Sequence, residues 1–353
     1  MVVSGRGPRW RTKLPREGRG VTRRVCAVAL VRARGRVLAD GRDMNPADAS
    51  IVIVTKNGGD LWARVLEGLA RCDGFRDADV LVVDSGSSDR TLEHARKYPW
   101  IRIHTISPEE FGHGKTRNLG ARMTDPRRPA LVFLVQDATP TGPGFLRELL
   151  APLADPRVAG VFGRQIAYDW TNAIEKMFMA EQYPAESVVR GWDGAGRPRI
   201  RDIFFSNVCS AIRRRVFDEI PFDESLIISE DQQWSKSALL AGHKVAYQAT
   251  AAVYHSHNYP LKQLFKRNFD SGASLLEIAG DSVADLVRYE LGHVASGVRS
   301  LAEAGNTRLI PFFFAYEATR AVGVAAGRQA HRLPGPILRA LSLHAYHWAR
   351  GAR

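Results

Sequence analysis

The sequence predicts an α/β protein built on a mixed, mainly parallel sheet flanked by helices. From residue 50 onward, short β-branched runs alternate with stretches whose apolar residues recur at helical spacing, which is the pattern of βαβ units. Two apolar runs end in a carboxylate, Asp84 and Asp137, where a buried strand would stop. Because ligands of open α/β sheets bind beyond the carboxyl ends of the strands, these carboxylates are expected to converge on one crevice.

The expected elements follow one another with short connections. Strands are predicted at 50–55, 79–84, 101–106, 130–136 and 158–167, and residues 245–257 hold the last strand and the loop beyond it. Helices are predicted at 61–72, 85–98, 144–154 and 232–244. Residues 111–123 are predicted to be a loop leading into a short helix, and residues 204–220 a strand followed by a helix. The stretch 170–202 contains several glycines without a regular period, which predicts a long loop over the site.

The pattern divides the chain into three parts: a basic segment at 1–47, an α/β domain at 48–260 and a helical region at 261–353. Residues 1–43 hold twelve Arg and Lys against three Asp and Glu, so most of the net charge of +13 lies there and the remainder is mildly basic. The segment has no period and is expected to be disordered, or to precede a true start at Met44. A basic arm that binds phosphates or anionic lipid is the alternative; without interleaved aromatic residues, nucleic acid is not an expected partner.

Membrane insertion and disulfides are not expected. The nearest approach to a span, residues 309–327, is interrupted by Glu317 and Arg320. The three cysteines are scattered, which fits a reducing compartment. The chain is therefore expected to be cytoplasmic, with peripheral contact at the inner face of the cell membrane through an amphipathic helix after residue 260, where Lys262, Lys266 and Arg267 lie beside Leu261, Leu264 and Phe265.

Two acidic motifs suggest a nucleotide and metal site. In DSGSSD (84–89), the Asp84 carboxylate can accept a hydrogen bond from the imide N–H of uracil or thymine, and Gly86 lets the backbone approach a ligand; helix capping by Asp84 and Asp89 is the alternative. In Gln136-Asp137-Ala138, Asp137 offers the hard oxygen that a divalent ion beside a diphosphate prefers.

Further polar groups supply the remaining chemistry. Asp231 or its neighbour Glu230 could take the proton of an acceptor hydroxyl, although an acidic pair can also cap a helix. One of His255 and His257 could complete a metal site as a neutral imidazole. Lys115 and Arg117 could meet phosphate oxygens.

Eight short motifs occur in a fixed order that resembles the family 2 inverting glycosyltransferases, closest to their rhamnosyltransferase-like branch. They are TKNGG (55–59), VVDSGSSD (82–89), FGHGKTRNLGA (111–121), FLVQDATP (133–140), FGRQ (162–165), SNVCSAIRR (206–214), SEDQQW (229–234) and AVYHSHNY (252–259). The resemblance covers about residues 48–275. It implies a GT-A fold for the 48–260 domain, a dTDP- or UDP-sugar donor, a glycan or lipid-linked acceptor, a divalent metal such as Mg²⁺ or Mn²⁺, and inversion at the anomeric carbon.

The resemblance also implies residue roles. Asp84 would bind the base, Asp137 would stand in for the usual Asp-x-Asp pair, Asp231 would be the general base, and His255 would approach the metal or diphosphate. The nucleotide sugar is expected to contact Thr55, Asn57, Asp84, Gly86, Asp89, Lys115, Arg117, Gln136 and Asp137.

Transfer of an activated deoxyhexose such as rhamnose is the function predicted from these motifs. A hexosyltransferase, a processive polysaccharide synthase and a non-catalytic nucleotide-sugar-binding protein are the alternatives. The synthase is disfavoured because such enzymes carry transmembrane helices, and the non-catalytic protein because the acidic turn at Asp231 is intact.

Removal of the basic segment tests the first boundary. Protein that starts at Met44 should unfold cooperatively within a few degrees of the full chain, because an uncompensated, aperiodic segment adds little to the core. Thermal unfolding followed by circular dichroism measures this. Loss of the cooperative transition would mean that the segment packs into the domain.

Overall fold

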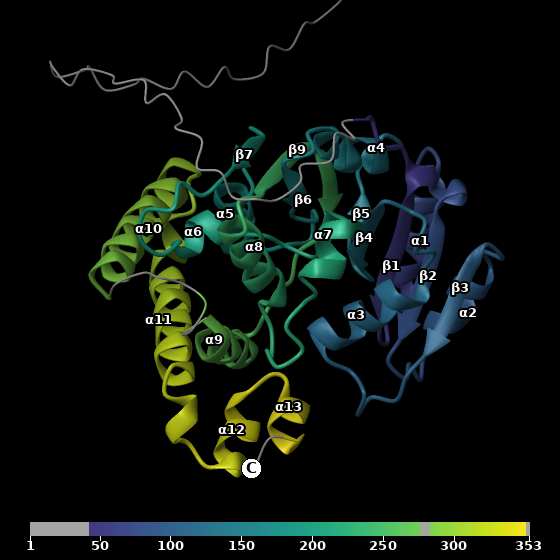
Figure 1. Ribbon diagram of the computed structural model, residues 1–353. Coiled ribbons are helices and arrows are strands. Elements are labelled where there is room, and N and C mark those ends of the chain that lie inside the picture. Colours follow the sequence, from purple (N-terminus) through teal and green to yellow (C-terminus); the bar gives the residue numbers. More distant parts are fainter. Residues whose placement is uncertain (1–41, 276–277, 279–282, 351–353) are drawn as a thin grey trace, which may run out of the picture. The chain divides into compact units, whose positions relative to one another are not determined.

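The computed structural model describes residues 42–275, 278 and 283–350, so residues 1–41 of the basic segment lie outside this range (Figure 1). Met44 is already buried in the core, and Asn45 caps the short 3₁₀ helix η1 (Pro46–Asp48). The core thus includes a residue a few positions before the predicted start of the domain at residue 48. Cys72 and Cys209 are buried free thiols.

A mixed nine-stranded sheet forms the centre of the fold, in the order β3-β2-β1-β4-β8-β6-β9-β5, with β7 paired to β9 (Figure 1). Its strands are β1 (Ala49–Thr55), β2 (Asp79–Asp84), β3 (Ile101–Thr105), β4 (Ala130–Val135), β5 (Thr139–Pro140), β6 (Val158–Ile166), β7 (Val188–Arg190), β8 (Cys209–Arg213) and β9 (Lys244–Tyr254). The first four strands are mutually parallel, as are β6 and β9, whereas β8 runs antiparallel between β4 and β6.

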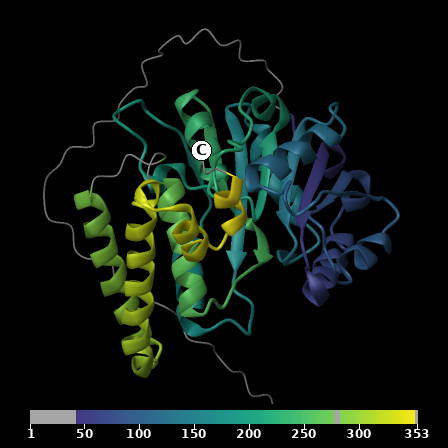
Figure 2. The ribbon, with the colours of Figure 1, turned by 90° about the horizontal axis from the view of Figure 1, so that it is seen from below.

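Alternating side chains on the strands fill two cores on opposite faces of the sheet. Ile51 and Ile53 of β1 pack with Trp62 in the first core, and the intervening Val52 packs in the second core with Trp234. This is the period-2 alternation of a strand that is covered on both faces. Helices accordingly lie on both sides of the sheet (Figure 2). They are α1 (Gly59–Ala70), α2 (Thr91–Arg96), α3 (His113–Met123), α4 (Phe145–Leu150), α7 (Arg214–Glu219) and α8 (Glu230–Leu240), with the 3₁₀ turns η2 (Phe75–Asp77) and η3 (Ala151–Ala154).

The prediction of a long loop at 170–202 is wrong. This stretch contains α5 (Ala173–Gln182), β7 and α6 (Ile200–Ile203). The Asn172 side chain caps α5 by accepting a hydrogen bond from the Glu175 N–H, and Ile174 is buried against the C-terminal helices. Because that burial comes from residues far along the chain, from Leu264 to Tyr316, the local pattern does not reveal the helix. The loop predicted at 111–123 is likewise mostly helix, since α3 begins at His113.

The C-terminal region is helical, as predicted. It contains α9 (Leu261–Leu275), α10 (Val283–Glu303), α11 (Ile310–Gly327), α12 (Gly335–Leu341) and α13 (Ala345–Arg350), with the 3₁₀ turns η4 (Thr307–Leu309) and η5 (Ala330–Arg332). These helices belong to the same compact unit as the sheet. Helices α9 and α11 touch along their backbones, because a Cβ at Gly272 would strike the Val324 carbonyl and one at Gly327 would strike the Phe269 carbonyl.

Two expectations about membranes need correction. The apolar side chains of α9 do not face outward, since Leu264 is buried and Phe265 packs against a small core around Phe269. Conversely, the helical segment Thr307–Gly327 is long and apolar enough to cross a membrane by length and composition, despite Glu317 and Arg320. Both ionisable side chains are accommodated by pairing with each other, at 2.8 Å.

The glycine contact between α9 and α11 gives a stability prediction. We expect Gly327→Ala to destabilise the fold by about 1–3 kcal/mol, because the added methyl forces the helices apart. The matched control is Gly292→Ala on α10, where a Cβ meets nothing within 4 Å. That substitution should stabilise the fold by about 0.5–1 kcal/mol. Urea unfolding of both variants provides the comparison, and equal effects would contradict the close packing.

Candidate active site

Strands β1, β2 and β4 end at the same edge of the sheet, where the two predicted carboxylates lie. Thr55 pairs with Asp84 in the ladder, and Asp84 with Thr105. The Asp84 carboxylate is fully buried and accepts four hydrogen bonds: from Thr55 Oγ1 at 3.1 Å, Gly86 N at 3.0 Å, and Ser87 N and Oγ at 2.8 and 2.5 Å. Asp84 therefore orders the loop after β2 and stands behind the wall of the site.

Asn57 and Asp89 join the loops after β1 and β2. Asn57, in the left-handed region with φ 48°, accepts a hydrogen bond from Ser88 N at 2.8 Å through its Oδ1. Asp89 accepts hydrogen bonds from Gly59 N at 3.0 Å and from Thr91. The Thr91 hydrogen bonds lower the pKa of Asp89, which stays ionised. These residues fix the loops that a nucleotide would meet.

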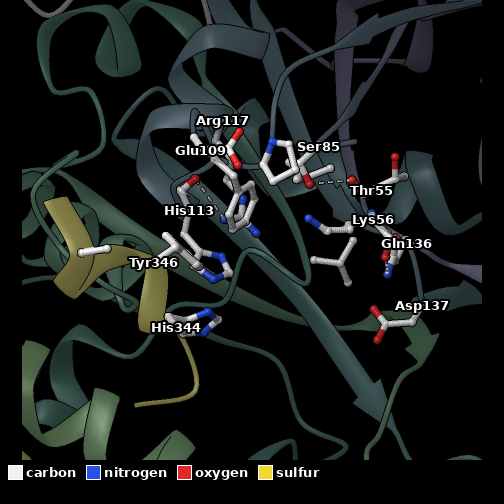
Figure 3. A pocket seen from close by; sticks show the side chains of 15 residues that line it. Thr55, Lys56, Ser85, Glu109, His113, Arg117, Gln136, Asp137, His344 and Tyr346 are labelled. Atoms are coloured by element: carbon white, nitrogen blue, oxygen red, sulfur yellow. Dashed lines mark hydrogen bonds between the residues drawn. The ribbon is translucent and has the colours of Figure 1, made fainter. Parts of the chain in front are cut away.

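A cavity of about 670 Å³ opens at this edge (Figure 3). It is lined by Val54, Thr55, Lys56, Ser85, Pro108, Glu109, Phe111, His113, Arg117, Val135, Gln136, Asp137, His344, Tyr346 and Ala349. Of the predicted contacts, Thr55, Arg117, Gln136 and Asp137 line it. Lys115 is exposed and lies in a separate hollow of about 340 Å³.

Gln136 holds the chain after β1 in place. Its Oε1 accepts a hydrogen bond from Lys56 N at 2.7 Å, and its Nε2 donates to Lys56 O at 2.9 Å. The side-chain amide thus pairs with both the N–H and the C=O of one residue, as a neighbouring strand would. A carboxylate could not make the second bond, because it has no N–H to donate.

Asp137, His255 and His257 form a cluster in which the three candidate ligand atoms lie within 4.8 Å of one another. His255 Nε2 is 3.6 Å from Asp137 Oδ1, and His257 Nε2 is 3.6 Å from Asp137 Oδ2. Burial lowers the pKa of His255 to about 4 and also lowers that of His257, against the opposing effect of Asp137, so both rings are neutral near pH 7. Neutral imidazoles and a carboxylate are ligands for a divalent cation.

Gln165 orients the first of these imidazoles. Its Nε2 donates to Tyr183 Oη at 2.6 Å and to Ser206 Oγ at 3.0 Å, which leaves its Oε1 to accept from His255 Nδ1 at 2.8 Å. The proton on Nδ1 places the Nε2 lone pair of His255 toward Asp137. The ring is thus held in the tautomer that metal binding requires.

The acidic turn at the start of α8 is tied to α3 by a buried ion pair. Arg117 Nη1 lies 2.8 Å from Glu230 Oε1, with both side chains almost completely buried. Asn207 Nδ2 donates to the same Glu230 oxygen at 3.2 Å. Arg117 also lines the cavity, so the acidic turn connects to the cavity through this side chain.

Asp231 is the less enclosed of the two carboxylates. It is half-buried and accepts one backbone hydrogen bond on each oxygen, from Asn207 N at 3.0 Å and from Gln232 N at 2.8 Å. Burial, together with the neighbouring Glu230 charge, raises the pKa of Asp231 well above its ordinary value. Ser229, immediately before the pair, adopts the left-handed conformation with φ 69°, a strained geometry that often accompanies functional sites.

The C-terminal segment supplies one wall of the cavity, which the sequence reasoning missed. His344 and Tyr346 lie beside His113, on the side of the cavity opposite Asp137 (Figure 3). The rings of His113 and His344 pack edge to face, with their centroids 4.9 Å apart. Burial lowers the pKa of both imidazoles to about 3, so this wall is uncharged. The ring-rich run HAYHW (344–348) is the signal that could have revealed it.

The family model described as "Glycosyltransferase like family 2" matches residues 46–270, well over half of the chain. The chain belongs to this family. It is therefore a glycosyltransferase, as its motifs predicted.

Two curated relatives are similar to this glycosyltransferase. The O-antigen chain rhamnosyltransferase RfbN of Salmonella typhimurium is 35% identical over 224 residues, 63% of this chain and 71% of the relative. The O-antigen chain rhamnosyltransferase WbaN of Salmonella anatum is 36% identical over 196 residues, 55% and 62% of the two chains.

A solved structure supports the predicted GT-A fold. The mannosyltransferase PcManGT from Pyrobaculum calidifontis, in complex with GDP-Man and Mn²⁺, aligns with a TM-score of 0.52 at 15% identity, covering 83% of this chain and 90% of that one. At this identity the likeness concerns the fold alone. The expected GT-A fold is thereby confirmed.

The hydrogen bond from His255 to Gln165 gives a prediction about metal binding. Gln165→Met removes the acceptor for His255 Nδ1, so affinity for Mn²⁺ should fall by roughly 10- to 100-fold. Tyr183→Phe is the control, because it removes another partner of Gln165 and leaves the His255 contact in place. Calorimetric titration of both variants with Mn²⁺ measures this. Unchanged affinity in Gln165→Met would place the cation away from His255.

Proposed function

We propose that this enzyme transfers a 6-deoxyhexose, rhamnose, from a dTDP- or UDP-linked donor to a hydroxyl of a glycan or lipid-linked acceptor, with inversion. The observation that carries the proposal is the combination, at one sheet edge, of the Asp137 cluster with an acidic turn tied to the same cavity by Arg117. The identity to two rhamnosyltransferases supports the sugar class.

The donor would bind with its base toward the ends of β1 and β2. Ser85 and Lys56 line the cavity there, whereas Asp84 lies behind it. Asp84 would therefore affect binding of the nucleotide base indirectly. It accepts hydrogen bonds from the N–H groups of Gly86 and Ser87 and so holds the backbone of the loop that the base would contact. The diphosphate would lie toward Asp137, within reach of the Lys56 ammonium.

Asp137, His255 and His257 would hold a divalent cation. The Gln165-oriented imidazole of His255 and the uncharged ring of His257 fit that role, and a set with two nitrogen ligands favours Mn²⁺ over the oxygen-preferring Mg²⁺. When bound, the cation would offset the charge of the leaving diphosphate. The Mn²⁺ in the mannosyltransferase complex agrees with this assignment.

Asp231 is the better candidate for the general base. One Glu230 oxygen is engaged by Arg117 and Asn207, and the side chain is nearly inaccessible. Each Asp231 oxygen accepts one hydrogen bond and keeps a lone pair. As the acceptor oxygen bonds to the anomeric carbon and the bond from that carbon to the diphosphate oxygen breaks, the hydroxyl proton would pass to Asp231. Its raised pKa makes it a stronger base than an ordinary aspartate.

Two substitutions separate the roles of the carboxylates. Asp231→Asn keeps the shape and removes the basicity, so transfer should fall by roughly 10² to 10⁴ while donor affinity stays within a few-fold. Asp137→Asn should weaken Mn²⁺-dependent donor binding as well as turnover. Turnover with dTDP-rhamnose and UDP-glucose, beside donor titration with and without Mn²⁺, provides the readouts. Near wild-type transfer by Asp231→Asn together with inactive Glu230→Gln would move the base to Glu230.

The pH profile checks the same assignment. A base must be ionised to accept a proton, so kcat/KM should rise with pH and level off above the raised pKa of Asp231. The midpoint should therefore lie above that of an ordinary aspartate, which titrates near about pH 4. A rate that stays flat down to that pH would contradict the role.

A further inference from the structure

Helix α11 exposes only apolar side chains. Eight of its residues are exposed and none of them is polar: Pro311, Phe312, Phe314, Ala315, Ala318, Ala321, Val322 and Ala325. The largest are Phe312, Phe314 and Val322, which are 49, 50 and 58% exposed. The opposite side of the helix packs on α9 and α10 (Figure 1). We call these eight residues the α11 face.

Glu317 and Tyr316 of the same helix are turned inward. Glu317 is only 6% exposed and pairs with Arg320 at 2.8 Å. The Tyr316 hydroxyl donates to Glu175 of α5. Burial raises the pKa of both Glu317 and Glu175. A helix surrounded by water would do the reverse and bury phenylalanine while exposing glutamate. This arrangement suits a helix whose outer face meets an apolar medium.

The chain around this face is basic. Beyond Glu317 the sequence has no acidic residue. It carries Arg328 at the C-cap of α11, Arg332 in η5 and Arg339 in α12. Arg332 and Arg339 are exposed, as is Arg308 immediately before α11. The combination of an apolar face and unbalanced arginines complements a surface with acyl chains beneath anionic headgroups.

We propose that the α11 face docks the enzyme on an anionic lipid bilayer, with α11 lying in the plane of the interface. The helix would lie in the interface and not cross the bilayer, because one side of it is covered by α9 and α10. A second copy of the chain is a less suitable occupant, since it would bring like-charged arginines together. The membrane contact that was expected at α9 is thus proposed for α11 instead. This proposal does not depend on the proposed sugar transfer.

Vesicle binding by the full chain tests the proposal. The α11 variant combines Phe312→Gln, Phe314→Gln and Val322→Gln. The matched control combines Val188→Gln, Val189→Gln and Leu240→Gln, which removes three apolar side chains of similar exposure elsewhere on the surface. Wild type should sediment with phosphatidylcholine–phosphatidylglycerol vesicles at low salt and remain in solution with phosphatidylcholine alone. The α11 variant should bind at least about ten-fold more weakly, and the control should bind like wild type.

A second measurement reports on insertion directly. Emission from Phe312→Trp should be quenched by lipids with brominated acyl chains beyond the quenching seen in wild type, whereas Leu240→Trp should add no such quenching. The proposal is overturned if the α11 variant binds anionic vesicles as wild type does, which would assign binding to the basic segment at 1–43. It is equally overturned if wild type ignores vesicles and light scattering shows a dimer that the α11 variant loses, which would assign the face to a second copy.

Discussion

The buried ion pair between Arg117 and Glu230 is the interaction on which the arrangement of the active site depends. Its partners are 113 residues apart and join α3 to α8 at 2.8 Å. Removing two charges from water is costly, and the loss of either partner would leave the other uncompensated, which typically costs about 3–5 kcal/mol. Asn207 donates to Glu230 through its side chain and to Asp231 through its backbone. One network thus fixes three segments and leaves Asp231 as the more accessible of the two carboxylates.

The strands and the meeting of Asp84 with Asp137 at one edge were predictable, because hydrophobic runs mark buried parallel strands and such strands end together. The orientation of the Asp84 side chain was not predictable. Sequence gives the residue type at a strand end and does not tell which donors surround it. Asp84 is still within the ladder, paired to Thr55 and Thr105, so its side chain belongs to the buried part of the sheet. Ser85, the first residue beyond the strand, lines the cavity.

Elements whose burial depends on residues far along the chain were also not predicted, because the local sequence does not show those contacts. Helix α5 lies in a stretch whose later residues are rich in glycine, and its own burial depends on the C-terminal helices that cover Ile174. His257 was recognised as a candidate, but only the geometry places it beside Asp137 together with His255. The sequence also could not show that the apolar residues of α9 serve internal packing while several of those of α11 face outward, because only tertiary contacts decide which side of a helix is covered.

The C-terminal helices connect the outer surface to the cavity. Helix α11 lies against α9 through glycines that allow backbone contact. On α9, the buried Asp270 accepts hydrogen bonds from Leu343 N at 3.0 Å and His344 N at 3.1 Å, and Lys266 donates to Ser342 O at 3.4 Å. These bonds hold the segment whose His344 ring lines the cavity. Because closely packed helices move as a unit, docking through the α11 face would fix the C-terminal wall of the cavity relative to the bilayer. The entrance for a lipid-linked acceptor would then be set by the same helices that bind the membrane.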